Sequence, residues 1–383
     1  MWQHRRWRPA PVDLTFDIVH ARAGSVMNIS HSDMKLPIPE EMSFQKGRSM
    51  LWDMVLEYSL PHRHQGDTGE CPERQTLKRT AQETRCALPG LLDKLNSDHE
   101  AKRSKKLSSE SLDHLQPRDC PNFPSSATIQ VINDDTLNVA VRLAHFAQVN
   151  PLSLNSSNLL PIIINFASHR KPGGGWLNGA MAQEESICYR SSLSLSLKIE
   201  DYPLELDEVI YSPYILVMRS DLASGHTLLE SSSNTAEELP VISGITIAAI
   251  HRPLLQTKSH KESKTRQCGH SLHSRRSTNS PSPSRQRNQQ FFALDRDRSL
   301  TKKKMRLALR IAAAHKHSML VLGALGCGVY ANPPAEVAKC WLEVLKEDEF
   351  RGNWWRKVHF AVYDSKNEGI FETFRQILDG EEV

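Results

Sequence analysis

The sequence predicts an α/β domain in which helices cover a central β-sheet on both faces. Two short runs, "PIIINF" (161–166) and "SMLVL" (318–322), are almost continuously apolar, which is typical of strands buried on both faces. Segments with apolar residues at helical spacing lie between such runs. Strands that alternate with helices favour a layered α/β arrangement.

The predicted elements begin near residue 75. We expect a helix over 75–95, because apolar residues recur there at three- to four-residue spacing. The polar, proline-containing segment 96–126 is predicted to be a loop, and its charged run "EAKRSKK" (100–106) to be solvated, with a nuclear import signal as the alternative. The remaining predicted strands are 128–132, 161–166, 209–217, 241–250, 318–322 and 357–363, and the remaining helices are 135–148, 183–197, 299–316, 334–346 and 368–378.

Two parts of the chain do not fit this pattern. Residues 1–70 show little sustained periodicity, so we expect a poorly structured N-terminal extension followed by one domain over 71–383. The segment 258–290 has almost no apolar residues and cannot bury enough surface to offset the entropy of ordering. We therefore expect a disordered insert there, and the sequence leaves open whether it regulates the protein or is an artefact of the gene model. Its cysteine and histidines do not have the spacing of a structural zinc site.

Composition limits the function classes and the compartment. The chain of 383 residues has a formal net charge of +4, which is too weakly basic to argue for nucleic acid. It has no apolar run long enough to span a bilayer, and no secretion signal is apparent. Seven scattered cysteines favour reduced thiols inside a cell. We expect a monomer in the nucleus, the cytoplasm or both, and the basic start leaves mitochondrial import open.

Two glycine-containing loops each follow a predicted buried strand. Gly173, Gly174 and Gly175 follow the first strand, and "GALGCGVY" (323–330) follows the second. Ligands of open α/β sheets bind at the carboxyl ends of strands, where loops of little bulk let backbone N–H groups approach a phosphate. The alternative is a pair of tight strand–helix turns. Neither loop matches the P-loop or the dinucleotide fingerprint, so we expect another type of nucleotide-phosphate site.

Two adjacent carboxylates follow the first loop. Seven residues separate Gly175 from Gln183, Glu184 and Glu185. Glutamates also favour the first turn of any helix, which is the structural alternative. Burial and mutual repulsion would raise a carboxyl pKa and the helix dipole would lower it, and the sequence leaves the balance open. Consecutive residues cannot flank a sugar ring from opposite sides, so in glycoside chemistry one glutamate must act first as acid and then as base.

These motifs carry a resemblance to a known family. "NFASHRKPGGGWLNGAMAQEES" (165–186) resembles the signature of the microbial-type poly(ADP-ribose) glycohydrolases, which are macrodomain proteins. "LGALGCGVYANPPAEVA" (322–338) is similar to the second ligand loop of that family, and weaker similarity extends over about residues 75–380 in matching order. The resemblance implies a macrodomain-like three-layer αβα sandwich with a mixed central sheet and an N-terminal helical extension.

The resemblance also implies roles for individual residues. Glu185 would be the catalytic residue, which protonates the leaving ribose oxygen and then activates the attacking water. Glu184 would hold the ribose hydroxyls near the scissile bond, and Gln183 would support the loop and the ligand. Tyr330 stands where the family often has Phe and would pack on the ligand. Independently of the resemblance, we expect His169, next to the first loop, to face solvent, with contact to the ligand as the alternative. The residues expected around the distal ribose and diphosphate are Asn165, Gly173, Gly174, Gly175, Gly326, Cys327, Gly328 and Val329.

The implied activity is hydrolysis of ribose–ribose bonds in poly(ADP-ribose), with release of ADP-ribose. Two alternatives remain open: a macrodomain that binds ADP-ribose without hydrolysing it, and a hydrolase that removes single ADP-ribose units from protein or nucleic acid. The expected partner is the polymer or an ADP-ribosylated protein, with no membrane and no direct nucleic-acid binding. No metal or other cofactor is expected, and cleavage at chain ends or inside the polymer is left open.

Overall fold

The computed structural model describes residues 71–150, 160–231, 234–258 and 289–383. The predicted N-terminal extension (1–70) and nearly all of the predicted insert (258–290) lie outside these residues.

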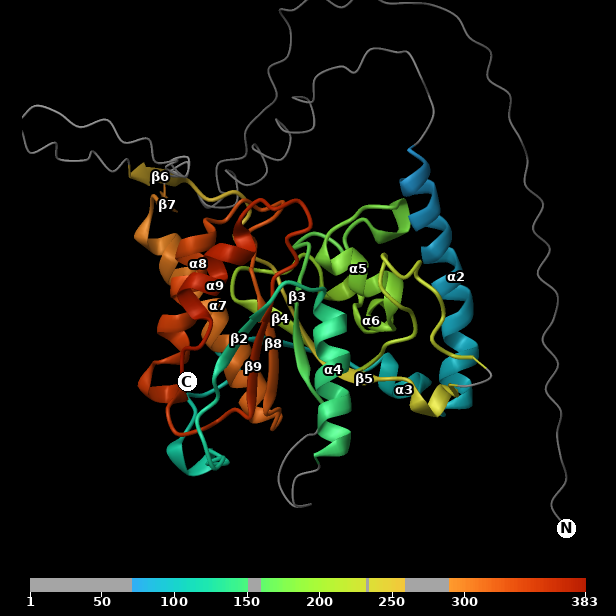
Figure 1. The fold of residues 1–383 in the computed structure, drawn as a ribbon, viewed down its shortest axis with the longest axis horizontal. Coiled ribbons are helices and arrows are strands. Elements are labelled where there is room, and N and C mark those ends of the chain that lie inside the picture. Colours follow the sequence, from blue (N-terminus) through green and yellow to red (C-terminus); the bar gives the residue numbers. More distant parts are fainter. Residues whose placement is uncertain (1–70, 151–159, 232–233, 259–288) are drawn as a thin grey trace, which may run out of the picture. The chain divides into compact units, whose positions relative to one another are not determined.

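A seven-stranded mixed sheet forms the centre of the domain (Figure 1). Its strand order is β1-β4-β5-β3-β8-β9-β2. Neighbouring strands from β5 to β2 are parallel, whereas β4 runs antiparallel to both β5 and β1. The strands are β1 (Lys105–Ser108), β2 (Ile129–Ile132), β3 (Ile162–Phe166), β4 (Glu208–Leu216), β5 (Val241–Ile247), β8 (Met319–Gly323) and β9 (Lys357–Ala361), and a separate hairpin pairs β6 (Leu255–Lys258) with β7 (Gln289–Phe292).

Helices cover both faces of the sheet, so the predicted α/β layering is confirmed (Figure 1). One face carries α7, α8 and α9, and the other carries α4, α5 and part of α2. The helices are α2 (Pro72–Lys94), α3 (Asp98–Ala101), α4 (Thr136–Val149), α5 (Gln183–Arg190), α6 (Leu193–Ser196), α7 (Asp295–Ala314), α8 (Pro334–Leu345) and α9 (Ile370–Leu378).

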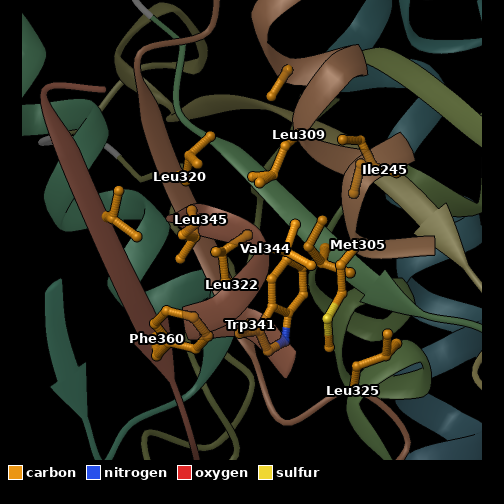
Figure 2. Packing of buried hydrophobic residues seen from close by; sticks show 14 of the residues in the cluster. Ile245, Met305, Leu309, Leu320, Leu322, Leu325, Trp341, Val344, Leu345 and Phe360 are labelled. Carbon is orange, nitrogen blue, oxygen red and sulfur yellow. The ribbon is translucent and has the colours of Figure 1, made fainter. Parts of the chain in front are cut away.

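Strand β8 shows why continuous apolar runs predict buried strands. Leu320 and Leu322 enter the core shared with α7 and α8, where Trp341 lies beside them (Figure 2). Met319 and Val321 enter the core on the opposite face, shared with α4. Because side chains alternate across a strand, a strand covered on both sides needs an apolar residue at every position.

The charged run 100–106 is a correction to the sequence-based expectation. Its first residues end α3, where Ala101 is fully buried, and Lys105 begins the edge strand β1. Pairing with β4 overrides the polar composition, because Leu107 packs inward while Lys106 forms an ion pair of 2.8 Å with Glu208. Lysines suit an edge strand, where charge discourages pairing with another chain.

The helix predicted over 183–197 is interrupted. α5 ends at Arg190 because Ser191 is extended (φ −146°) and bridges to Val217, and α6 then begins at Leu193. The Ser191 hydroxyl donates to the Ile187 carbonyl at 2.7 Å. Serine side chains compete in this way for backbone partners, which weakens helix interiors.

Candidate active site

The two glycine loops lie at the same edge of the sheet. β3 and β8 are parallel neighbours, with Ile162 opposite Leu320, so the loops that follow them leave the sheet side by side. β5 flanks β3 on its other side. This edge, at the carboxyl ends of parallel strands, is where open α/β sheets bind ligands.

Gly174 explains why glycines and carboxylates share one segment. Its φ is +56°, and a Cβ there would lie 2.4 Å from Glu185 Oε1 and 3.1 Å from Glu184 Oε2. The next residue, Gly175, donates its backbone N–H to Glu185 Oε1 at 2.9 Å. Only glycine combines the left-handed conformation with so close an approach. The loop therefore rests directly on the two carboxyl groups.

The rest of the first loop is held on α5 by aromatic side chains. Gly173 (φ +67°) packs on the indole of Trp176, which is buried. The Tyr189 hydroxyl donates to the Trp176 carbonyl at 2.9 Å and lies 2.8 Å from the Ala180 carbonyl. These contacts close the loop over the helix that carries the glutamates.

Glu184 is almost completely buried, with 2% of its surface exposed. Burial raises its pKa from the ordinary 4.5 to about 8. Hydrogen bonds from Ser168 N (2.7 Å) and Asn165 Nδ2 (3.3 Å) oppose the rise, and the charge of Glu185 adds to it. At Glu184, therefore, burial outweighs the hydrogen bonds. Glu184, whose pKa is raised, is the residue that the resemblance expects to bind the ribose hydroxyls.

Asn165 lies at the end of β3 with no exposed surface. Its Nδ2 donates to Glu184 Oε1 and, at 3.2 Å, to Thr246 Oγ1 on β5. Its Oδ1 is buried and has no hydrogen-bond partner among the described residues. An unsatisfied buried acceptor is uncommon and calls for a donor.

Gln183 fastens the start of α5 to the sheet. Its Oε1 accepts from Phe166 N at 2.8 Å, and its Nε2 donates to the Ile164 carbonyl at 2.7 Å and to Thr136 Oγ1 at 3.1 Å. All three contacts are to protein groups at the end of β3 and the beginning of α4. In this structure Gln183 supports the loop and the helix.

The second loop is shaped by an asparagine that the sequence analysis missed. A Cβ at Gly326 (φ +73°) would lie 2.5 Å from both Ala249 Cβ and Asn332 Nδ2. Asn332 is buried, and its Nδ2 donates to the Ile250 carbonyl at 2.7 Å and the Gly326 carbonyl at 3.2 Å. A polar residue directly before the Pro-Pro pair was the available signal. Asn332 ties this loop to the segment after β5.

The other residues of the second loop differ in exposure. Gly328 has open space where a Cβ would stand, and Val329 is 67% exposed. Cys327 is buried, which raises the pKa of its thiol, so it offers a ligand its backbone and not a thiolate.

Tyr330 connects the two loops. Its hydroxyl lies 3.3 Å from His169 N and 3.2 Å from His169 Nδ1, and its ring packs edge-on against His251 at 4.9 Å. The expectation that His169 faces solvent is therefore only partly right, because its ring is half-buried and contacts the second loop.

Other candidate sites are weaker. Two shallow hollows of about 330 and 280 Å³ lie away from the glycine loops, at the C-terminal end and behind α5.

Within the described residues, no three His, Cys, Asp or Glu side chains gather closely enough to hold a metal ion. No helix of the described part combines the length and apolarity needed to cross a membrane.

A family comparison agrees with this geometry. Residues 74–220 match the family model "Microbial-type PARG, catalytic domain", where PARG is poly(ADP-ribose) glycohydrolase. The match confirms the predicted resemblance to the microbial-type poly(ADP-ribose) glycohydrolases. The matched range contains the glycine triplet and Gln183–Glu185, whereas the second loop lies beyond it. No curated protein matches the chain.

Solved glycohydrolase structures share the fold. The chain is similar to poly(ADP-ribose) glycohydrolase from Thermomonospora curvata, with 24% identity, a TM-score of 0.55 and coverage of 79% of this chain and 99% of that one. It is also similar to a point mutant of the Deinococcus radiodurans glycohydrolase in complex with ADP-ribose, with 26% identity, a TM-score of 0.51 and coverage of 72% and 94%. The mixed sheet between helices is thus the fold of these glycohydrolases.

Proposed function

We propose that this chain is a poly(ADP-ribose) glycohydrolase, which hydrolyses ribose–ribose O-glycosidic bonds and releases ADP-ribose. The observation that carries the proposal is the contact of Gly174 with both carboxyl groups. A backbone loop suited to ribose and diphosphate lies directly against the groups that can cut the bond beside them. The family match over 74–220 and the ADP-ribose bound by the Deinococcus protein support the same activity.

Glu185 performs both proton transfers in this proposal. It gives its proton to the leaving ribose oxygen as the bond from that oxygen to C1 breaks. It then takes a proton from the water that attacks C1, which restores the acid. Glu184 and Glu185 are consecutive on one helix and lie on the same side of the loop. A second carboxylate on the opposite face of the sugar, as in most glycosidases, is not needed.

The remaining site residues hold the product part of the substrate. Asn165, whose buried Oδ1 has no hydrogen-bond partner among the described residues, lies beside the distal ribose, and Glu184 binds the hydroxyls nearer the scissile bond. Gly173–Gly175 and the backbone of 326–329 surround the diphosphate. The Tyr330 ring packs on the ligand from the second loop. No cofactor takes part.

The cellular setting is part of the same proposal. The substrate is the polymer or an ADP-ribosylated protein, and the catalytic unit is a monomeric domain over 71–383 in the nucleus or cytoplasm. The six cysteines among the described residues are free, which is consistent with a reducing compartment.

The variant Glu185→Gln tests the proposal. We expect release of ADP-ribose from purified polymer to fall by about 10²- to 10⁴-fold, because the acid–base group is lost. Calorimetric affinity for ADP-ribose should stay close to that of the wild type. Glu200→Gln, at an exposed carboxylate outside the two glycine loops, is the matched control and should keep full activity.

Other outcomes would lead to other conclusions. Turnover retained in Glu185→Gln, with loss in Glu184→Gln, would move the acid–base role to Glu184. Wild-type protein that binds ADP-ribose without releasing product would be a reader. Release from mono-ADP-ribosylated protein or nucleic acid, but not from polymer, would make it a mono-ADP-ribosyl hydrolase.

A further inference from the structure

The helix face opposite the catalytic carboxyl is fastened by polar contacts. Gln183, Ser186 and Arg190 are spaced i, i+3 and i+7 along α5, so they point within about 60° of one another. Glu185 points to roughly the opposite side, toward the glycine loop. One face of α5 thus carries the chemistry and the other carries its attachment.

α5 depends on that attachment. It has eight residues, and its N-cap residue, Ala182, makes no side-chain hydrogen bond to the first turn. Isolated helices of this length are unstable in water, and Ala is a poor N-cap. The position of Glu185 in the first turn is therefore set by contacts from neighbouring elements.

Asp135 provides a central contact. It is the N-cap of α4, where its Oδ1 accepts from Leu137 N at 2.8 Å and from Asn138 N at 3.3 Å. The same oxygen pairs with Arg190 Nη1, and its Oδ2 accepts from Ser186 Oγ at 3.3 Å. One carboxylate therefore joins the start of α4 to two successive turns of α5.

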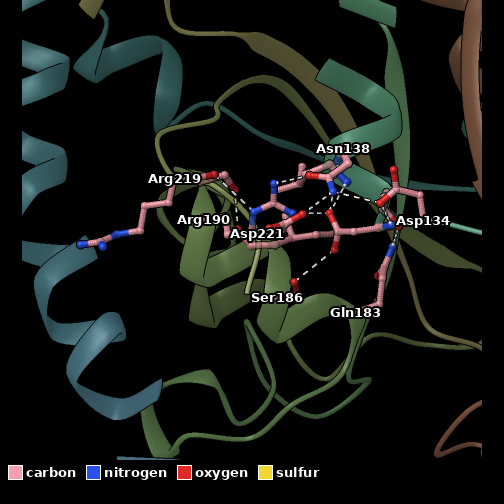
Figure 3. Close-up of polar contacts among 12 residues, drawn as sticks. Asp134, Asn138, Gln183, Ser186, Arg190, Arg219 and Asp221 are labelled. Carbon is pink, nitrogen blue, oxygen red and sulfur yellow. Dashed lines mark hydrogen bonds and ion pairs between the residues drawn. The ribbon is translucent and has the colours of Figure 1, made fainter. Parts of the chain in front are cut away.

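Arg190 holds the other end of α5. It is only 2% exposed, its Nη2 donates to Asn138 Oδ1 at 2.8 Å and its Nε donates to the Arg219 carbonyl at 3.3 Å. Asn138 is fixed in turn by the Asp221 carboxylate at 2.7 Å (Figure 3). The planar guanidinium presents several donors in fixed directions, so it fixes orientation better than a flexible cation does.

We propose that the Asp135–Arg190 pair positions α5 so that Glu185 meets the scissile bond. Arg190 pairs with Asp135 on the side of α5 away from Glu185, so in this proposal the pair acts through the helix and not on the reacting atoms. The inference rests on the proposed hydrolysis. A misplacement of about 1 Å at a catalytic group can cost on the order of 10²-fold in rate. Binding also responds to a shift of α5, because the first glycine loop rests on the carboxyl groups of that helix, but it should fall less than the rate.

The variant Asp135→Asn tests this role in the full chain. Asn keeps the N-cap of α4 but removes the charge that Arg190 faces. We expect kcat per binding-competent site, with sites counted by ADP-ribose calorimetry, to fall at least about tenfold. The Kd for ADP-ribose should rise by a smaller factor than kcat falls, because the lost alignment acts mainly on the transition state. Arg190→Lys should also lower kcat, because lysine keeps the positive charge but lacks the planar set of N–H donors that the guanidinium presents.

Arg142→Gln is the matched control. Arg142 lies on the same α4, its side chain is 55% exposed, and it pairs with Asp134 at 2.7 Å. Asp134 also accepts from Asn138 Nδ2 at 2.9 Å, so this variant alters the exposed edge of the network and leaves the Asp135–Arg190 pair in place. We expect its kcat and Kd to stay within about twofold of the wild type, as for most surface substitutions.

The outcomes separate the two proposals. Wild-type protein that releases no ADP-ribose overturns the hydrolase proposal and the positioning role with it. Wild-type turnover with unchanged kcat per site in both Asp135→Asn and Arg190→Lys overturns the positioning role alone, even if thermal stability falls. Loss of ADP-ribose binding in parallel with kcat also overturns it, because the pair would then hold the pocket as a whole.

Discussion

At Gly174 a single missing side chain decides whether the loop can lie on the two glutamates. The residue has a positive φ, and a Cβ built on it points at the carboxyl oxygens. Positive φ alone disfavours other residues by about 1–2 kcal/mol. Glu185 Oε1 would also clash with any Cβ at this position, which is a second reason against residues other than glycine. Conformation and contact thus select the same residue type.

We therefore predict that Gly174→Ala lowers both stability and activity. A Cβ 2.4 Å from Glu185 Oε1 must displace the loop or the carboxyl group. ADP-ribose affinity should drop at least about tenfold, and the free energy of unfolding should fall by about 1–2 kcal/mol. Gly90→Ala is the control, because Gly90 lies in α2 with no atom within 4 Å of a Cβ, and it should be neutral or stabilising. Unchanged affinity in Gly174→Ala would contradict the close packing.

At the scale of elements, continuous apolar runs and helical spacing predicted the layered core. β3 and β8 and the helices α4 and α8 lie close to their predicted ranges, because burial on the sheet dictates their composition. β1 was missed because its identity depends on pairing with β4, which no local pattern records. Likewise, the break at Ser191 depends on a bridge to Val217.

The sequence predicted the candidate site only where the backbone conformation or a close contact requires a particular residue type. The glycine triplet beside the adjacent glutamates is such a case, since few residues other than glycine fit a left-handed loop over carboxyl groups. Asn332, Asp135 and Arg190 were not found, because each acts through partners far away in the sequence. Polar residues in isolation look like ordinary surface residues until the fold buries them.

The contact between the two loops leads to an element-scale prediction. Tyr330→Phe keeps the ring but removes the hydroxyl that contacts His169 at 3.2–3.3 Å. A lost hydrogen bond of about 1 kcal/mol should weaken ADP-ribose binding by about fivefold, because the loops are less well joined. Calorimetry measures the change, with Tyr363→Phe, at a 68% exposed tyrosine, as the control. Equal affinities in the two variants would show that the hydroxyl does not hold the loops together.

At the scale of the whole molecule, α2 extends the domain beyond the two core layers. Its Leu88, Leu91 and Leu92 pack with Leu216 and Met218 in a third apolar cluster. Near its N-terminus, Arg74 Nε donates to the Asn178 carbonyl at 2.8 Å, in the turn that follows the glycine triplet. Helix α2 thus supports the first glycine loop from outside, and stability of the domain is coupled to the shape of the candidate site.

Glu184 makes the stability of the whole domain depend on pH. Its pKa is about 8 when folded and near 4.5 when exposed, so between these values the folded state binds more protons than the unfolded state. Unfolding then releases protons and becomes easier as pH rises. Relative to Glu184→Gln, the wild type should lose up to about 1.4 kcal/mol of unfolding free energy per pH unit from pH 5 to pH 8. Denaturant unfolding of both proteins at each pH measures the difference, in which the titrations of groups that do not interact with Glu184 cancel. A difference that stays constant or grows with pH would show that Glu184 is already ionised in the folded protein.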